Sequence, residues 1–298
     1  MTATATLRIG TRHSRLALAQ AEIARDALSG TMGGAAELVP ISTRGDAISA
    51  SRPRAGWVVT DGQFTRELER ALIAREVDVV VHSYKDLPTA PVDGLAIAAV
   101  LERGDARDCL VTRDGETLDE LRFGARIGTS SPRRAAQLAA RRSDFVATPI
   151  RGNVETRLRR LADGEFDAVI LAAAGLDRLG IAVPHHARLP FELMLPAPAQ
   201  AALALQVRGD DDGLRISLGE IDHQSTRVAV EAERSLLRRI GGGCLAPLGA
   251  LAEVTEGTLR LRAAFEDGTG DFARAEASGP AADPERVVDD VARKLAGR

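Results

Sequence analysis

The chain of 298 residues is long enough for two or three domains, each with a hydrophobic core of its own. Its 45% hydrophobic and 27% charged residues are typical of a globular protein, whereas a net charge of −3 and 3% aromatic residues argue against a general nucleic-acid binder. The N-terminus has no basic region followed by an apolar run, so we expect a cytoplasmic protein without a secretory signal or membrane span. The two cysteines, Cys109 and Cys244, cannot by themselves form a disulfide framework or a metal site.

The first hundred residues predict strands that alternate with helices. Short apolar runs at 7–9, 37–43 and 78–82 indicate strands, and amphipathic stretches at 15–28 and 64–73 indicate helices between them. This order predicts an α/β lobe with a doubly wound parallel sheet. The segment 47–62, before the second helix, has no periodicity, and we expect residues 51–56 within it to form a mobile loop.

The turn after the first strand is a candidate anion site. It contains Arg12, and Ser14 is suited to cap the following helix. The free backbone N–H groups of a helix N-terminus attract anions, and Arg12 would add a bidentate donor for a carboxylate or phosphate. An ordinary surface arginine is the alternative interpretation of Arg12.

The segment 78–88 carries the strongest catalytic signal. A buried β-branched run ends in Ser83, Lys85 and Asp86, and ligands of open α/β sheets bind at the carboxyl ends of strands. Of the 39 basic residues, two are lysines and 37 are arginines, so Lys85 suggests a requirement for a compact ammonium group. Asp86 is therefore a candidate acid beside a cation, although a solvated turn is also consistent with this sequence.

A charged link at 102–108 predicts a lobe boundary, and a second strand–helix pattern follows it. The strand at 126–128 leads through a small polar turn to Pro132 and a helix that continues to 142. Arg133 and Arg134 lie in the first turn, where they oppose the helix dipole. A bound anion would offset that cost, whereas two solvated arginines are the alternative. We expect Cys109 to be an inert core thiol.

Arginines recur after the strand ends of both predicted lobes. Further strands are expected at 145–150 and 167–172, each followed by a helix. A single arginine in such a position is uninformative, but six suggest a cleft for a polyanion. They are Arg12, Arg133, Arg134, Arg151, Arg157 and Arg178.

The C-terminal third predicts a small α+β domain. The segment 195–200 is expected to return the chain to the first lobe. Helices are expected at 227–240 and 284–295, with an alternating strand at 258–265. The first helix is followed by three glycines and Cys244, so we expect an accessible thiol, which nearby arginines would make more nucleophilic.

These motifs, in this order, resemble the porphobilinogen deaminase (hydroxymethylbilane synthase) family over nearly the whole chain. The matching stretches are Leu-Arg-Ile-Gly-Thr-Arg-His-Ser at 7–14, Thr-Arg-Gly-Asp at 43–46, Val-His-Ser-Tyr-Lys-Asp-Leu-Pro at 81–88, Gly-Thr-Ser-Ser-Pro-Arg-Arg at 128–134, Arg-Gly-Asn-Val-Glu-Thr-Arg-Leu at 151–158, Ala-Gly-Leu-Asp-Arg-Leu-Gly at 174–180 and Gly-Gly-Gly-Cys at 241–244.

The resemblance implies two lobes like those of type II periplasmic binding proteins and a third domain that carries a cofactor. We place domain 1 at 1–101 and 200–219, domain 2 at 107–195 and domain 3 at 224–298. The implied cofactor is dipyrromethane, joined by a thioether to Cys244. The implied reaction links four porphobilinogen molecules head to tail with loss of ammonia and then releases hydroxymethylbilane by hydrolysis. A monomer is expected, with no nucleic-acid or membrane partner and no metal.

The resemblance also implies the roles of individual residues. Asp86 matches the catalytic aspartate, which would assist loss of the amino group and stabilise the cationic azafulvene electrophile, and Lys85 would assist it. The residues implied to hold the cofactor are Cys244, Ser83, Lys85, Asp86, Thr129, Ser131, Arg133, Arg134, Arg151 and Gly152. Those implied to hold the substrate are Arg12, Ser14, Phe64, Arg151, Arg157, Ala172, Arg178 and Gln200.

Two segments depart from the family pattern. The loop at 55–63 has an acidic residue where a basic one is common, and alanines at 199 and 201 stand where the family usually has glycine. An alanine forced to a positive φ costs about 1 kcal/mol. Because of these departures, a catalytically impaired family member is an alternative to an active enzyme. A non-enzymatic two-lobe solute-binding module is the alternative from another functional class.

Overall fold

The structure of the chain is a computed structural model that describes residues 6–32, 35–43, 45–46, 62, 64–241, 243 and 246–297. The chain divides into two compact units, residues 1–103 with 202–227 and residues 104–201 with 228–298. Within the described ranges, no helix combines the length and the apolar character needed to cross a membrane. Each unit is described separately below.

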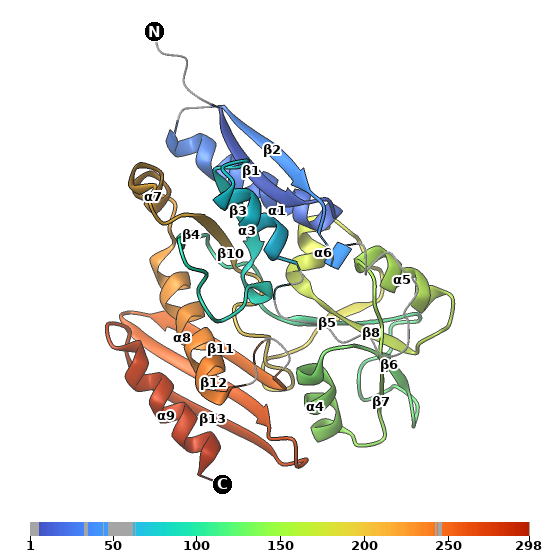
Figure 1. The fold of residues 1–298 in the computed structure, drawn as a ribbon. Helices are drawn as coiled ribbons and strands as arrows, with labels where there is room; N and C mark the ends of the chain where they lie inside the picture. The colour runs from blue at the N-terminus through green and yellow to red at the C-terminus, as the bar shows by residue number, and fades with distance from the viewer. Residues whose placement is uncertain are drawn as a thin grey trace. The chain divides into compact units, whose positions relative to one another are not determined.

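The first unit is built on a five-stranded sheet in the order β2-β1-β3-β10-β4 (Figure 1). β1 (Leu7–Arg12) pairs in parallel with β2 (Ala36–Ile41) and with the central strand β3 (Val79–Ser83). β10 (Leu203–Arg208) pairs antiparallel with both β3 and β4 (Leu95–Val100). Because β1, β2 and β3 run in the same direction, the turns that follow them meet at one edge of the sheet.

Helices cover both faces of this sheet. α1 (Arg15–Met32) and α7 (Asp212–Gly219) share one hydrophobic cluster with Val79, and α3 (Arg66–Ile73) shares another with Val80. Neighbouring residues of a strand point to opposite faces, so the apolar run of β3 serves both clusters. Burying each valine contributes about 1.5–3 kcal/mol to the free energy of unfolding.

The second unit contains a similar sheet in the order β7-β6-β8-β5-β9. β6 (Arg126–Gly128) pairs in parallel with β7 (Val146–Thr148) and β8 (Ala168–Ala172). β5 (Asp108–Thr112) is antiparallel to β8 and to β9 (His186–Arg188). The three parallel strands again direct their carboxyl ends to one edge.

Three helices follow those parallel strands closely. They are α4 (Pro132–Arg141), α5 (Val154–Ala162) and α6 (Ala173–Leu179). Ser131 caps α4 by accepting a hydrogen bond from the backbone of its first turn, and Asn153 does the same for α5. The helix N-termini therefore lie at the edge where the predicted ligand-binding residues are concentrated.

The second unit also contains an antiparallel sheet of β11 (Leu248–Thr255), β12 (Thr258–Glu266) and β13 (Phe272–Pro280). One face of it packs against α8 (Gln224–Ile240) and α9 (Pro284–Ala296), coloured orange and red in Figure 1. The core between them includes Leu236, Leu248, Leu259, Leu261, Val288 and Val291. This α+β part corresponds to the predicted third domain, whose boundaries stay a prediction.

Both large sheets are mixed, a feature that the expectation of a parallel sheet did not include. β5 follows the charged link and β10 follows the crossover segment directly, without an intervening helix. No strand–helix–strand unit then requires these strands to run parallel to their neighbours. The return of the chain to the first lobe is confirmed, because β10 lies between β3 and β4.

Candidate functional site

The turn after β3 positions the candidate catalytic pair of the first unit. Lys85 and Asp86 lie in a short 3₁₀ turn, η1 (Tyr84–Asp86), which is closed by a 3.3 Å hydrogen bond from Leu87 N to Tyr84 O. Both side chains are half-buried. Ser83 precedes the turn, and its Oγ lies 2.8 Å and 3.0 Å from the two amide atoms of Gln20 on α1. The strand end and the helix thus hold Asp86 on a fixed backbone.

A cavity of about 20 Å³ lies beside this turn, which is room for about one water molecule. It brings together four predicted site residues: Arg12, Phe64, Ser83 and Asp86. Its complete lining is Arg12, Ala17, Gln20, Phe64, Thr65, Leu68, Val81, His82, Ser83 and Asp86. The first unit therefore combines a carboxylate, a guanidinium, a hydroxyl and an aromatic ring in one small space.

Arg12 is held by two neighbours, Asp46 and Phe64. Its Nη2 lies 2.5 Å from Asp46 Oδ1 and its Nε 3.3 Å from Asp46 Oδ2, while Thr43 Oγ1 donates to the same carboxylate over 2.7 Å. The guanidinium carbon lies 4.1 Å from the centre of the Phe64 ring. Asp46 was not predicted as a site residue, although it closes the Thr-Arg-Gly-Asp motif. A ligand carboxylate would meet a guanidinium whose orientation is already fixed.

Ser14 caps α1 as the sequence predicted. Its Oγ accepts a 3.2 Å hydrogen bond from Ala17 N, and its carbonyl oxygen accepts one of 2.9 Å from Leu18 N. Thr11 Oγ1 donates to Ala17 O over 3.0 Å and closes the same turn from the strand side. The role of Ser14 towards a substrate stays a prediction.

His82 lines this cavity and, like Asp46, was not predicted as a site residue from the sequence. Its Nε2 lies 3.0 Å from Gln206 Oε1 on β10. Burial lowers the pKa of His82 to about 4, so the ring is neutral at pH 7 and donates to the amide oxygen. Only its place in an otherwise apolar strand hinted at such a partner.

In the second unit, the turn between β6 and α4 is closed by its own hydroxyl groups. Ser131 N donates to Thr129 Oγ1 over 3.1 Å, and Ser131 Oγ accepts from Arg134 N over 3.4 Å. Thr129 N donates to Thr148 O on the neighbouring strand over 2.9 Å. Thr129 and Ser131 thus shape the backbone from which the arginines of α4 project.

Asp108 sits between the two arginines of α4. It is fully buried, with Arg133 Nη1 2.8 Å from its Oδ2 and Arg134 Nη2 2.7 Å from its Oδ1. Burial alone would raise the pKa of Asp108, but the two guanidinium groups outweigh it, so that the pKa lies well below its usual value. The anion that the sequence predicted opposite these arginines is thus supplied in part by the chain itself. Nothing in the local pattern of β5 identified Asp108.

Arg157 and Arg178 differ from that pair, because neither forms an ion pair with a carboxylate in the part of the chain that the structure describes. Arg157 Nε donates to Gly152 O over 2.9 Å, and Arg178 donates to Ala201 O. Burial lowers the pKa of each to about 10, and Arg134 adds to the effect at Arg157. Both stay charged at neutral pH and retain N–H groups for a ligand.

The turn after β7 requires glycine. Gly152 has a φ of 106°, and a Cβ atom there would lie 2.7 Å from Thr156 Cγ2. Arg151 is half-buried in the same turn. Ala172, also half-buried, ends β8 directly before α6, which carries Arg178. The second unit therefore gathers its predicted ligand residues at the carboxyl ends of three parallel strands.

Gln200 lies in the crossover segment and is buried. Its Nε2 donates to Asp108 Oδ1 over 2.9 Å and to Ala106 O over 2.8 Å. The amide thus supports the carboxylate between the arginines, and its contact with substrate stays a prediction. Cys244 and, except for Gly62, the loop at 55–63 lie outside the described residues.

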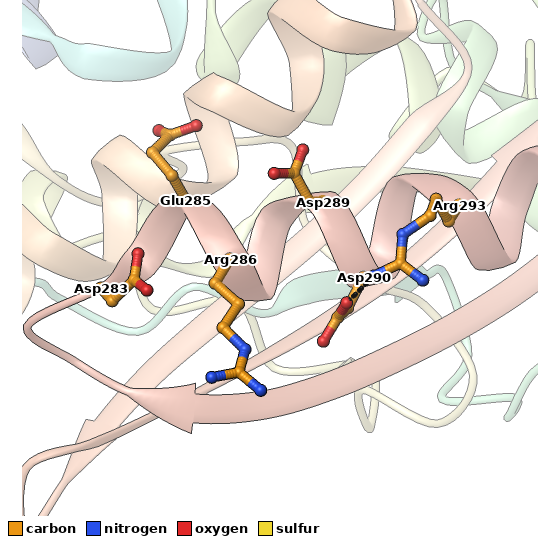
Figure 2. A pocket seen from close by; sticks show the side chains of 6 residues that line it. All are labelled: Asp283, Glu285, Arg286, Asp289, Asp290 and Arg293. Atoms are coloured by element: carbon orange, nitrogen blue, oxygen red, sulfur yellow. Dashed lines mark hydrogen bonds and ion pairs between the residues drawn. The ribbon is translucent and has the colours of Figure 1, made fainter.

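A larger hollow of about 640 Å³ lies along α9 (Figure 2). Its lining contains four acidic and two basic residues and comes from this helix and its N-cap: Asp283, Glu285, Arg286, Asp289, Asp290 and Arg293. Glu285 and Asp289 pair with Arg239, and Asp290 pairs with Arg293. We interpret this hollow as the solvated face of a helix, because four of its six charged side chains, Glu285, Asp289, Asp290 and Arg293, already have partners within the chain.

Two models of known protein families match this chain. A family model described as "Porphobilinogen deaminase, dipyromethane cofactor binding domain" matches residues 7–215, and one described as "Porphobilinogen deaminase, C-terminal domain" matches residues 228–297. The chain belongs to the porphobilinogen deaminase family. The predicted resemblance is therefore confirmed, and the family's cofactor-binding domain covers the predicted ligand-binding residues of both lobes.

Curated relatives agree with this assignment. The porphobilinogen deaminase of Desulforudis audaxviator is 47% identical over 96% of this chain and 93% of its own length. That of Nocardia farcinica is 48% identical over 95% of this chain and 82% of its own length. Among solved structures, the Bordetella pertussis BvgS periplasmic VFT2 domain is similar at a TM-score of 0.44 and 15% identity, covering 72% of this chain and 86% of that one.

Proposed function

We propose that the chain is an active porphobilinogen deaminase, a transferase of the hydroxymethylbilane synthase class that acts in the cytoplasm as a monomer. It joins four porphobilinogen molecules head to tail with release of ammonia and then hydrolyses off hydroxymethylbilane. The observation that carries this proposal is the excess of guanidinium groups in the second unit: Arg133 and Arg134 share the buried carboxylate of Asp108, and Arg157 and Arg178 are bonded to backbone carbonyl groups without an ion pair among the described residues. Each porphobilinogen carries an acetate and a propionate, which would neutralise such an excess.

The donor set also fits a covalent dipyrromethane. Such a group carries four carboxylates and two pyrrole N–H groups, so it needs several cationic donors and one acceptor. Arg157 and Arg178 have N–H groups without a carboxylate partner in the described chain. When bound through Cys244, the group would supply the nucleophilic pyrrole carbon that starts the chain. We propose that the cofactor-binding residues predicted from the sequence hold the dipyrromethane group.

We propose Asp86 as the catalytic acid, because it lines the same small cavity as Arg12 and Ser83. It would hold a proton near the departing amino group and accept a hydrogen bond from a pyrrole N–H. Arg12, oriented by Asp46 and Phe64, would bind a substrate carboxylate beside it. Lys85 follows in the same turn and would contact cofactor or substrate, and Ser83 is oriented by Gln20.

The first test is the intact mass of the denatured protein together with its turnover of porphobilinogen. We expect a mass increment equal to two pyrrole units, its absence in Cys244→Ser, and consumption of porphobilinogen with release of ammonia by the wild-type chain only. A protein that carries the increment but consumes no porphobilinogen would be an impaired family member. A protein that binds porphobilinogen without the increment and without turnover would be a solute-binding module, and the proposal would be wrong.

A further inference from the structure

The segment 195–201, which we call the strap, connects several of the proposed ligand residues. At one end, Leu195 O accepts hydrogen bonds from Arg133 Nη1 over 2.6 Å and from Gln137 Nε2 over 3.0 Å. At the other end, Ala201 O accepts a hydrogen bond from Arg178. Two of the arginines of the second unit that we propose to bind carboxylates, Arg133 and Arg178, are therefore bonded to the backbone of the strap.

The middle of the strap acts on the same cluster through Gln200. The amide of Gln200 donates to Asp108, the carboxylate between Arg133 and Arg134. The flanking alanines have φ values of 60° and 72°, a backbone conformation that is unfavourable for alanine. Such a conformation persists only where the surroundings enforce it.

Glu233 on α8 is the group that holds this backbone. It is fully buried, and its Oε2 accepts a 2.6 Å hydrogen bond from Ala199 N. Its Oε1 accepts a second one of 2.7 Å from Ala252 N on β11. One carboxylate therefore fixes the strap to the C-terminal sheet and to the helix that ends four residues before Cys244.

We propose that Glu233 is a positioning residue for carboxylate binding. By fixing Ala199 N, it keeps Gln200 on Asp108 and thereby holds the guanidinium groups of Arg133 and Arg134 in place for the carboxylates of substrate and growing chain. This inference rests on the proposed function for its ligand, but the chain of contacts on which it depends lies within the second unit.

The test is Glu233→Gln in the cofactor-loaded protein. Glutamine has the same size but only one oxygen acceptor, so one of the two backbone N–H groups loses its partner. We expect the KM for porphobilinogen to rise about tenfold while kcat changes less than about threefold, the pattern of weakened binding. In the cofactor-free protein, we expect the Nε–Hε NMR signals of Arg133 and Arg134 to shift, and Gln200→Met to shift the same signals.

Glu285→Gln is the matched control. Glu285 accepts hydrogen bonds from Ser235 Oγ over 2.8 Å and Arg239 Nη2 over 2.6 Å, so it also anchors α8 but on a side away from the strap. We expect it to lower stability without moving KM or the arginine signals. Unmoved signals in both Glu233→Gln and Gln200→Met, or equal effects in Glu285→Gln, would overturn the inference. If the wild-type chain did not turn over porphobilinogen, the proposed function would fail, and the NMR signals alone would still decide the positioning role.

Discussion

Individual arginines of this chain differ in the partners that hold their guanidinium groups. Arg8 is paired with Asp78 over 2.8 Å and joins β1 to the start of β3, a purely structural contact. Arg157 and Arg178 contact only backbone carbonyl groups among the contacts that the structure gives them. A composition of 37 arginines and two lysines cannot separate these classes. The partner of each guanidinium group shows the difference, and we expect an anionic ligand at the half-buried charges of Arg157 and Arg178, which form no ion pair with a carboxylate among the described residues.

The first prediction concerns Asp86. Asparagine preserves the shape of the side chain but cannot carry a negative charge or transfer a proton. We expect Asp86→Asn to fold normally and to lower kcat for porphobilinogen by at least a hundredfold, or about 3 kcal/mol in activation free energy. Asp93→Asn, an exposed carboxylate in the following loop, is the control and should leave turnover unchanged. A loss of less than about tenfold would show that Asp86 is not the catalytic acid.

The second prediction concerns Asp105 and pH. Burial raises the pKa of Asp105, but hydrogen bonds from Arg107 and Arg188 outweigh it and lower the pKa to about 2. A depressed pKa contributes stability above the unfolded value near 4, and this contribution is lost as the pH falls through 2. We expect Asp105→Asn to lower the free energy of unfolding by about 2 kcal/mol at pH 7 and by about half as much at pH 3.

Urea denaturation at several pH values checks this difference. Asp119→Asn removes the partner of Arg141 in an ion pair in which both side chains are at least half exposed. An exposed pair contributes less than about 1 kcal/mol, so this control should have a small effect. A loss at Asp105 that stays constant from pH 7 to pH 3 would contradict the prediction.

At the scale of elements, the strap contains two alanines in a backbone conformation that usually requires glycine, and the surrounding contacts hold them there. The sequence identified the alanines at 199 and 201 as departures from glycine, and the structure places both at positive φ in a buried segment. We expect Ala199→Gly and Ala201→Gly each to raise the free energy of unfolding by about 0.5–1 kcal/mol. Ala202 has no positive φ, so Ala202→Gly should lower the free energy of unfolding. Equilibrium urea unfolding measures all three, and destabilisation by the first two would exclude backbone strain.

The helices and strands themselves were largely predictable. The strand before Ser83, the capped helix after Ser14 and the helix opened by Pro132 follow from local signals: apolar periodicity, a capping hydroxyl and a proline at the first helical position. The direction of β10 was not predictable in the same way. It depends on how the strap delivers the chain to the sheet, a non-local property.

At the scale of the whole molecule, both units and the residue at position 244 are needed for the proposed reaction. The first unit supplies the candidate acid, and the second supplies most of the arginines that are candidates to bind carboxylates. We expect protein purified without cofactor to gain covalent mass after incubation with preformed hydroxymethylbilane and to become active. Cys244→Ser should gain none. A wild-type chain that stays at its polypeptide mass would show that it has lost the attachment chemistry.

The sequence by itself determined the α/β lobes, the small C-terminal domain, the family and the candidate residues at strand ends, because these depend on local periodicity, turn chemistry and contiguous motifs. The tertiary structure alone decided which of these residues have partners within the chain. Asp108 between two arginines, Asp46 on Arg12 and Glu233 on the strap lie 26, 34 and 34 residues from the groups they contact. Ion pairs and hydrogen bonds between such distant residues depend on how the sheets and helices pack, and no local pattern encodes them.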